Sequence, residues 1–335
     1  VKAPQGVLGK PARALVGFAK TGILAPGAKE TVTINVAKES FASYDDSGAT
    51  GHKSCYVLEE GSYEFYVGSD VRSAAFAGAY EQPFKVVETL TEAMAPVEAF
   101  ERMKAVAGED GTLKPGYEAA PLRTVDPAKR MKENRMEPIP YTGDKGYKLG
   151  DVLDKKVTME EFVAQLSDDD LIELLGGQPN TGVANTFGFG NLPDYGVPNI
   201  MTADGPAGLR IAPECGVCTT AWPCATLLAY TWNPNLVEKV GAAGAEEVKE
   251  NNIAVWLTPA VNIHRNPLCG RNFEYYSEDP LLAGKMAAGM VRGIQSQHIG
   301  ASVKHFAANN KETNRKHSDS RVSCLLYTSP SPRDI

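Results

Sequence analysis

Several features that would assign a chain of this length to a common class are missing. The 335 residues carry a formal net charge of −7 and no block of Lys and Arg, so nucleic acid is not an expected partner. The longest uncharged stretch, residues 215–237, is interrupted by Pro, Asn and Thr, which favours a buried strand and loop over a membrane span. No secretory signal is visible, but the chain starts at Val1 rather than Met, so this says nothing about location.

Phosphate-binding and metal-binding motifs are missing as well. Residues 188–190 and 241–244 are rich in glycine but lack the spacing of a dinucleotide-binding turn, and no Walker-type loop occurs. Six cysteines are scattered, and the CGVC of residues 215–218 has no second CxxC or paired histidines to complete a zinc site. We therefore expect no metal and no organic cofactor. Scattered cysteines fit a reducing compartment, and we expect a bacterial cytoplasmic protein.

The N-terminal quarter of the chain has the pattern of an all-β module. Apolar and polar residues alternate in TVTINVA (31–37) and in SYEFYVGS (62–69), as in half-buried strands. Segments 14–20 and 84–88 are plausible flanking strands, and Gly-containing turns separate the runs. Short strands, frequent turns and the lack of a helical segment predict a β-sandwich over residues 1–88.

The pattern weakens from residue 89 to residue 156. Six prolines punctuate this segment, which we interpret as a linker that is mostly extended, with one helix over residues 92–108. From residue 157 helices and strands alternate. Helix-start signals stand at Thr158, Ser167, Asn233-Pro234 and Asp279-Pro280.

Apolar strands are expected between these helices, at residues 198–203, 253–257 and 300–306. A strand–helix alternation of this kind predicts a parallel sheet flanked by helices. Each strand is followed by charged residues, which is typical of a barrel enzyme, whose site lies at the C-terminal ends of the strands. We therefore predict an α/β barrel of the TIM (β/α)8 type.

The charged residues that follow the predicted strands form the candidate site. Asp204 and Arg210 follow the first strand, Arg271 follows the second, and Lys304 and His305 follow the third. Such a set suits a neutral polyol, because each sugar hydroxyl is both donor and acceptor. We expect Asp204 to accept from two adjacent hydroxyls, and the cationic side chains and His305 to donate to their oxygens. Asn309, Asn310, Glu312 and Arg315 are further candidates.

Four motifs in this part of the chain together resemble glycoside hydrolase family 3, and in particular its β-glucosidase branch. They are DGPAGLR (204–210), NIHRNPLCGRNFEYYSEDP (262–280), KHFAANNKETNR (304–315) and DSRVS (319–323). Residues 1–88 resemble the fibronectin type III-like domain of that family, placed before the barrel. The resemblance implies that Asp204, Arg210, Arg271, Lys304 and His305 bind the non-reducing sugar in the −1 subsite. The N-acetylglucosaminidase branch is disfavoured, because that branch continues its Lys-His motif with Phe-Pro-Gly-His.

The resemblance implies a retaining, exo-acting hydrolase of terminal β-D-glucosyl residues that works through a covalent glycosyl-enzyme. Its partner would be an oligosaccharide or β-glucoside, and neither nucleic acid nor a membrane; the full-length protein could form a homo-oligomer. The family's nucleophile lies in a Ser/Thr-Asp-Trp-type motif and its acid/base Glu on a separate domain. Nothing in this sequence matches either one. We therefore assign no catalytic residue within the chain and expect no measurable hydrolysis of aryl β-glucosides by the 335 residues alone.

The sequence also suggests a fragment. Residues 157–323 are fewer than the roughly 250 of a complete barrel, so the barrel is expected to be truncated. The final CLLYTSPSPRDI (324–335) cannot continue a helix and is interpreted as a non-native tail. Two alternatives to a β-glucosidase remain: a β-xylosidase or α-arabinofuranosidase of the same family, and a carbohydrate-binding protein without catalysis.

Overall fold

The computed structural model describes residues 1–92 and 95–322, and the predicted tail at 324–335 lies outside them. The chain divides into two compact units. The first comprises Val1–Arg135 and residues from Ser318 onward, and the second comprises Met136–His317. The predicted borders at residues 88 and 156 stay predictions, since the division between the units falls inside the predicted linker.

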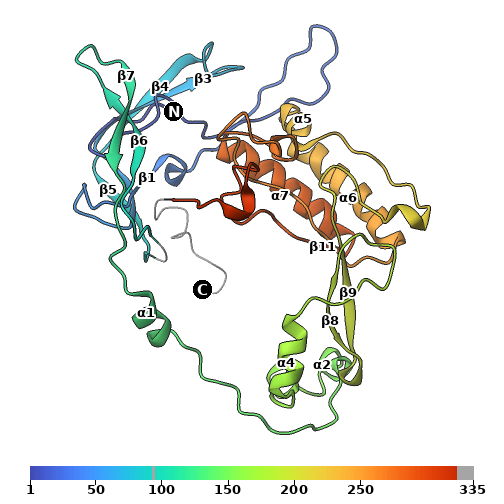
Figure 1. The fold of residues 1–335 in the computed structure, drawn as a ribbon. Coiled ribbons are helices and arrows are strands. Elements are labelled where there is room, and N and C mark those ends of the chain that lie inside the picture. The colour runs from blue at the N-terminus through green and yellow to red at the C-terminus, as the bar shows by residue number, and fades with distance from the viewer. Residues whose placement is uncertain (93–94, 323–335) are drawn as a thin grey trace. The chain divides into compact units, whose positions relative to one another are not determined.

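The first unit is built from antiparallel strands (Figure 1). One sheet has the order β1-β2-β5, from Ser43–Asp45, Cys55–Leu58 and Lys85–Thr89. A hairpin joins β3 (Gly61–Val67) to β4 (Ala75–Gln82), and a second joins β6 (Glu101–Ala107) to β7 (Leu113–Ala119). The strands predicted around residues 62–69 and 84–88 are thus confirmed as β3 and β5. The unit also contains the short helices η1 (Lys38–Phe41) and α1 (Pro127–Glu133).

Two other predicted strands of this unit are wrong. The structure assigns no strand to residues 14–20 or 31–37, and residues 31–35 are exposed. The segments do lie side by side, because a Cβ added to Gly17 would come within 2.6 Å of the Ile34 side chain. Alternation shows that a segment could be half-buried, but a strand also needs a backbone partner in register.

The predicted linker contains regular structure. The helix expected over residues 92–108 is wrong, because Glu101–Ala107 pairs with Leu113–Ala119 as the β6–β7 hairpin. The hydrogen bonding extends one residue beyond the strands, because the Ala120 N–H donates to the Phe100 carbonyl over 2.9 Å. By contrast, residues 135–148 have neither helix nor strand, as expected for a connector.

A small apolar core holds the first unit together. Val1, Phe41, Leu58 and Tyr63 are buried against one another, and Val16, Val36 and Phe65 pack around them. The rings of Phe41 and Tyr63 lie 5.2 Å apart. Burying aromatic and aliphatic side chains supplies most of the folding free energy of such a small core.

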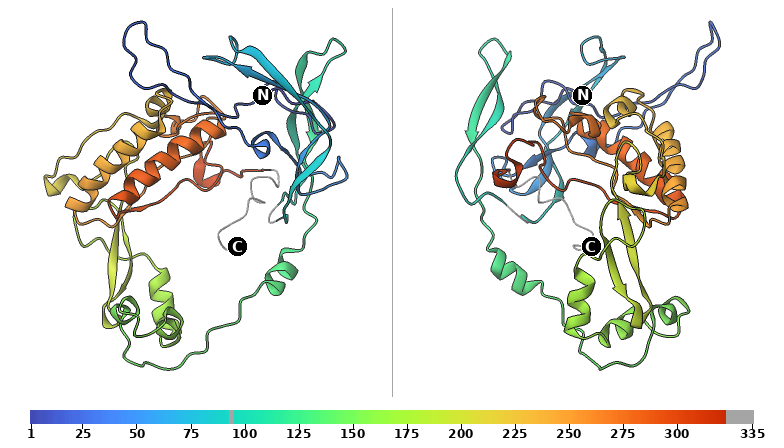
Figure 2. Two further views of the ribbon diagram at one scale, coloured as in Figure 1. Left: turned by 180° about the vertical axis from the view of Figure 1, so that it is seen from behind. Right: turned by 45° about the vertical axis from the view of Figure 1, so that its right-hand side comes forward.

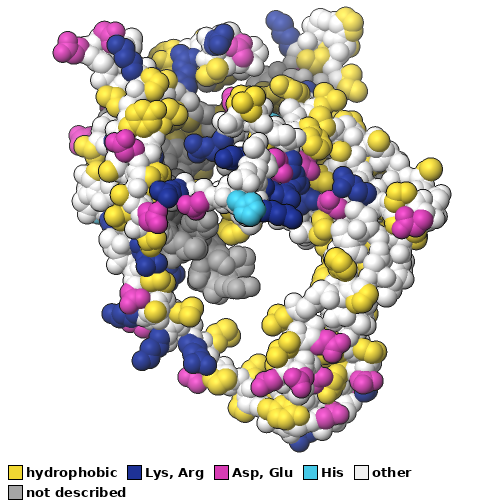
Figure 3. All heavy atoms as spheres, viewed as in Figure 1, with side chains coloured by type: hydrophobic (Ala, Val, Ile, Leu, Met, Phe, Trp, Pro, Cys, Tyr) yellow, Lys and Arg dark blue, Asp and Glu magenta, His cyan; other side chains and the backbone are white. Residues whose placement is uncertain are grey.

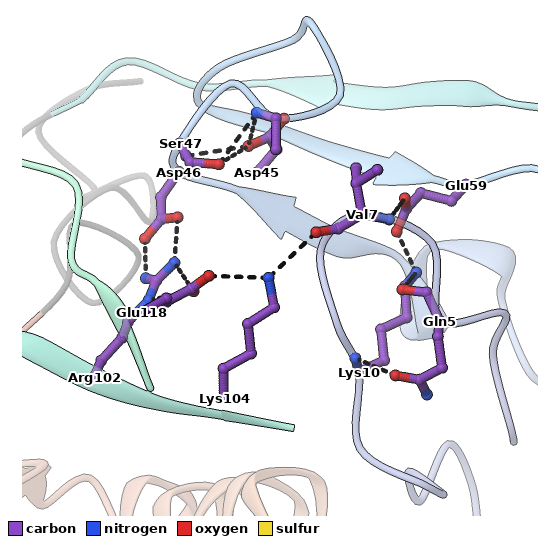
Figure 4. A network of polar contacts seen from close by, with 11 residues as sticks. Gln5, Val7, Lys10, Asp45, Asp46, Ser47, Glu59, Arg102, Lys104 and Glu118 are labelled. Atoms are coloured by element: carbon purple, nitrogen blue, oxygen red, sulfur yellow. Dashed lines mark hydrogen bonds and ion pairs between the residues drawn. The ribbon is translucent and has the colours of Figure 1, made fainter. Parts of the chain in front are cut away.

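Ion pairs and hydrogen bonds link several segments of the same unit (Figure 4). The Lys10 ammonium is 4% exposed and contacts the Glu59 carboxylate, which also accepts the Val7 N–H over 2.7 Å. Arg102 on β6 binds Asp46 through both terminal nitrogens and reaches Glu118 on β7 at 2.8 Å. These contacts tie the N-terminal segment and the β6–β7 hairpin to the loops beside β1 and β2.

The second unit contains a four-stranded sheet of order β11-β10-β9-β8. Its strands are Gly188–Leu192 (β8), Val197–Ala203 (β9), Val255–Trp256 (β10) and Gly300–Ala301 (β11). β9, β10 and β11 are parallel neighbours, with Val255 opposite both Thr202 and Gly300. The predicted parallel arrangement is confirmed for these three strands, whereas β8 pairs antiparallel with β9.

Two long helices connect the parallel strands, and they lie side by side (Figures 1 and 2). α6 (Pro234–Glu250) runs between β9 and β10, and α7 (Pro280–Ser296) between β10 and β11. Both begin as the sequence predicts, since the side chains of Asn233 and Asp279 accept backbone N–H groups of the first turn. Glycines let the two helices approach closely, because a Cβ on Gly241 or Gly289 would lie 2.6 Å from a backbone oxygen of the other helix.

Short helices complete the second unit. They are α2 (Leu149–Leu153), α3 (Met159–Ala164), α4 (Asp168–Leu175), η2 (Pro193–Tyr195), η3 (Pro213–Cys215), α5 (Ala225–Tyr230), η4 (Asn272–Glu274) and η5 (Arg315–His317). The capping boxes at Thr158 and Ser167 are both formed, which confirms two more predicted helix starts. Acidic side chains gather over α2 to α4 (Figure 3), where many of them complement helix N-termini. Among the described residues, no helix is long and apolar enough to cross a membrane.

Candidate functional site

The site residues lie where the parallel strands end. Asp204 is the first residue after β9, and Lys304 and His305 follow β11 by a few residues. Lys304 is held by two backbone bonds, from its N–H to the Pro259 carbonyl (3.0 Å) and from the Val261 N–H to its own carbonyl (2.7 Å). The C-terminal ends of parallel strands meet at one edge of a sheet, so the three residues are brought together by the topology itself.

Asp204 and Lys304 form the first half of the cluster. The Lys304 ammonium contacts Asp204 Oδ1 directly, although the two residues are 100 positions apart in sequence. The Asp204 N–H donates to Asn185 Oδ1 over 3.0 Å, which fixes the backbone at this point. The buried Trp256 ring on β10 donates through Nε1 to the carbonyl of Gly205 over 3.1 Å and holds the next residue.

The Asp204 carboxyl is ionised at neutral pH. Its partial burial favours the neutral form, but the hydrogen bonds from Lys304 and the Gly205 N–H outweigh this and lower its pKa below the ordinary value. A carboxylate in this state accepts hydrogen bonds and is a poor proton donor. Arg210 contacts Asp204 more weakly than Lys304 does, because its side chain is 64% exposed and its nearest nitrogen lies 3.4 Å from Asp204 Oδ2.

Arg271 and His305 form the second half of the cluster. Arg271 stands directly before η4, and its Nη2 donates to His305 Nε2 over 2.8 Å. Glu274, a buried residue of η4, accepts from Arg271 Nε over 2.5 Å and so holds the guanidinium in place. Arg271 Nη1 lies 3.8 Å from Glu312 Oε1, and the His305 N–H donates to Asn262 Oδ1 over 3.1 Å.

A tyrosine that the sequence reasoning did not single out completes this half. Tyr275 is fully buried, and its hydroxyl lies 3.2 Å from His305 Nδ1 and 2.8 Å from Asn309 Nδ2. Asn309 also donates to Glu312 Oε1 over 3.1 Å, and Arg315 lies 3.4 Å from Glu312 Oε2. The Oδ1 atom of Asn310 is buried without a partner. A tyrosine within an aromatic pair carries no sequence signal for such a role.

Each of the five predicted site residues makes a direct contact with another of the five, although Arg210 reaches Asp204 only at 3.4 Å. Asp204 joins Lys304, and Arg271 joins His305, which is the neighbour of Lys304 in sequence. Glu274 pairs with Arg271, three residues earlier in the sequence. Asp279 does cap α7 as expected.

Metal-binding side chains are not clustered in the part of the chain that the structure describes, where no group of three or more His, Cys, Asp or Glu has a geometry that could hold a metal ion. Cys215 and Cys218 of the CGVC motif are exposed, and Cys224 is half-buried.

Comparison with known families matches both parts of the chain. Residues 192–323 match the N-terminal domain of glycosyl hydrolase family 3, and residues 1–71 match a fibronectin type III-like domain. Most of the second unit is thus similar to the N-terminal domain of that family. The predicted resemblance to glycoside hydrolase family 3, with the fibronectin type III-like domain placed first, is confirmed.

Individual relatives agree with these matches. The chain is 51% identical to Beta-glucosidase A of Butyrivibrio fibrisolvens and 43% identical to a Beta-glucosidase of Ruminococcus albus, in each case over 96% of its length. It covers 41% and 34% of those two proteins. A solved β-glucosidase from Paenibacillus barengoltzii has a TM-score of 0.88 at 45% identity, over 92% of this chain and 35% of that one. The chain therefore spans about two fifths or less of these relatives.

Proposed function

We propose that the second unit is part of a (β/α)8 barrel of a retaining exo-β-glucosidase, and that its strand-end cluster binds the terminal glucosyl residue. The observation that carries this proposal is the convergence of Asp204, Lys304, Arg271 and His305 after three parallel strands. The three relatives described above, which align over 92–96% of this chain, are named as β-glucosidases, and this favours a β-glucoside over a pentoside as the substrate.

The chemistry of the cluster supports a sugar ligand. Asp204 is ionised and already positioned by Lys304, so its carboxylate can accept from two neighbouring hydroxyls without first being ordered. The opposed charges compensate each other, which limits the cost of keeping them partly dry. The ammonium of Lys304, 15% exposed, keeps donors beyond the one that Asp204 uses.

The same geometry favours a role in binding, and not in bond cleavage, for these residues. Retaining cleavage needs a nucleophile and a proton donor about 5–5.5 Å apart. Asp204 is ionised, so it cannot donate the proton, and its ion pairs with Lys304 and Arg210 make its oxygens weaker nucleophiles. Its contribution would be to orient the ring, which supplies rate through positioning.

A binding experiment on the chain itself tests this proposal. Glucose and methyl β-D-glucoside are titrated into the wild type, Asp204→Asn and Lys304→Met, with calorimetry or ligand-observed NMR as the readout. Each variant removes a charge-assisted hydrogen bond, and binding should weaken roughly 10- to 100-fold.

Asp154→Asn is the matched control. This aspartate of the same unit is 62% exposed and pairs with Lys156 at a distance of 2.9 Å, outside the cluster. Its variant should bind as the wild type does. Wild-type binding that survives Asp204→Asn unchanged would refute the proposal, as would the absence of any binding by a folded chain.

A further inference from the structure

The hydrogen bonds behind the cluster form a chain whose two ends have fixed polarity. At one end Arg271 can only donate, since a guanidinium has five N–H groups and no acceptor. At the other end the Glu312 carboxylate can only accept. His305, Tyr275 and Asn309 lie between them, and each of these can both donate and accept.

The fixed ends decide the direction of every bond between them. Arg271 Nη2 lies 2.8 Å from His305 Nε2, so this nitrogen must accept and cannot carry a proton. A neutral imidazole whose Nε2 is bare carries its proton on Nδ1. That N–H therefore donates to the Tyr275 oxygen, 3.2 Å away.

The other end leads to the same tyrosine. Because Glu312 Oε1 only accepts, the Asn309 atom 3.1 Å from it is the amide nitrogen. The second N–H of that nitrogen donates to the Tyr275 oxygen over 2.8 Å. The Tyr275 oxygen thus accepts two hydrogen bonds, and the hydroxyl donates its own proton to the backbone carbonyl of Asn309, 3.4 Å away. These three bonds use every donor and acceptor site of the hydroxyl.

We propose that Tyr275 is a positioning residue that holds His305 as the neutral tautomer protonated on Nδ1, with Nε2 as a hydrogen-bond acceptor. The single lone pair of Nε2 is occupied by Arg271, so a sugar hydroxyl would have to displace that N–H in order to donate to this nitrogen, and this last step rests on the proposed function. The role reverses the expectation from sequence, in which His305 donates. Tyr275 acts through His305 and has no assigned contact with the ligand.

Burial and charge agree with this assignment. Tyr275 is fully buried, and burial raises the pKa of its phenol, so the hydroxyl keeps its proton. Burial lowers the pKa of His305 to about 4, assisted by the neighbouring charges of Arg271 and Lys304, so the ring is neutral at pH 7.

NMR of the ring nitrogens tests the proposal without a ligand. The chain has five histidines, and His305→Gln identifies the resonances of His305 in a protein labelled with ¹⁵N-histidine. In the wild type at pH 7, we expect a protonated Nδ1 and a bare Nε2 for this residue. A proton on Nε2, or equal populations of the two tautomers, would overturn the proposal, and this measurement needs no variant that might fail to fold.

Two variants at neighbouring positions test the part that Tyr275 plays. Tyr275→Phe removes the acceptor of the Nδ1 proton, and the His305 signals should shift towards a mixture of tautomers. Tyr276→Phe makes the same change at a buried position outside the hydrogen-bond chain and should leave them unchanged. Unchanged His305 signals in a folded Tyr275→Phe would contradict the proposal. If that variant does not fold, wild-type protein grown with 3-fluorotyrosine weakens the same acceptor and should shift the Nδ1–H resonance.

The sugar step is measured separately. Binding of methyl β-D-glucoside should weaken roughly two- to tenfold in Tyr275→Phe, the effect of misaligning one hydrogen bond, and not in Tyr276→Phe. If the wild type binds no sugar but shows the Nδ1 tautomer that Tyr275→Phe disturbs, the proposed function fails and the role of Tyr275 stands. If sugar binds and the tautomer is the other one, the role of Tyr275 fails alone.

Discussion

The close crossing of α6 and α7 can be tested with two glycine substitutions in one helix. A Cβ on Gly293 would lie 2.0 Å from the Glu238 carbonyl oxygen and 2.8 Å from the Ala242 nitrogen. Both atoms belong to the backbone of α6, so no side chain can turn away to make room. A Cβ on Gly284, in the same helix, would meet nothing within 4 Å.

The expected magnitudes follow from this difference. Replacing a glycine inside a helix by alanine gains about 1 kcal/mol from helix propensity, and this gain is common to both variants. Gly284→Ala should therefore be more stable than the wild type by up to about 1 kcal/mol. Gly293→Ala must in addition force two helices apart, and such overpacking costs about 1–3 kcal/mol. Since the propensity gain cancels, the difference between the variants measures the packing cost alone.

Urea unfolding followed by tryptophan fluorescence is the suitable assay. The three tryptophans are Trp222, Trp232 and Trp256, and all belong to the second unit, so the signal reports that unit even if the two units unfold separately. The midpoints are compared at unchanged slope. Equal stability of Gly293→Ala and Gly284→Ala would show that the helices do not approach as closely as described, and the reasoning would be refuted.

Three further predictions concern a cap, a buried ion pair and a titration. Thr158→Ala removes the cap of α3 and should cost about 1 kcal/mol in the same unfolding assay. Lys10→Met leaves the Glu59 carboxylate buried without its cation and should destabilise the first unit by about 3 kcal/mol, measured by circular dichroism, whereas adding Glu59→Gln should restore part of the loss. The pKa of His305, lowered to about 4 by burial and then by Arg271, means that the unfolded chain binds a proton at higher pH than the folded one. The neutral His305 ring should therefore contribute fully to the free energy of unfolding above about pH 6.5, and this contribution should be lost as the pH falls towards 4. In His305→Gln the free energy of unfolding should depend less on pH over this range.

The helices of the second unit were predictable because their signals are local. A side chain at Thr158 or Asp279 needs only the next three residues to form its cap, so the sequence alone contains the whole interaction. The positions of the parallel strands were predictable for a related reason, although Val255–Trp256 and Gly300–Ala301 are shorter than the predicted strands 253–257 and 300–306. A continuous apolar run between two helices is best buried as a strand of a sheet whose faces are covered by helices.

The errors in the first unit arose where structure depends on distant partners. Residues 31–37 alternate as a strand does but have no assigned strand, and Glu101–Ala107 is a strand although its composition suits a helix. Glu101–Ala107 forms a strand because it pairs with Leu113–Ala119, and this pairing outweighs the helix propensity of the segment.

In the candidate site, too, some residues could be predicted from the sequence and others depend on distant partners. The motifs marked Asp204 and Lys304 as candidates, because charged residues shortly after apolar strands are visible in sequence. The supporting contact of Tyr275 was not visible. It depends on how the short η4 segment folds back toward the residues after β11, which no spacing rule encodes.

His305 and Asn309 both donate hydrogen bonds to the Tyr275 oxygen, and this limits how a proton can move between these residues. A proton can hop along a row of hydrogen bonds only if every donor points the same way. Here His305 and Asn309 point at the tyrosine from opposite directions, so a hop from the guanidinium end to the carboxylate end would require the Asn309 amide to turn over. The hydrogen bonds as they stand therefore do not pass a proton from one end to the other, and His305 contributes a dipole of fixed direction to the cluster.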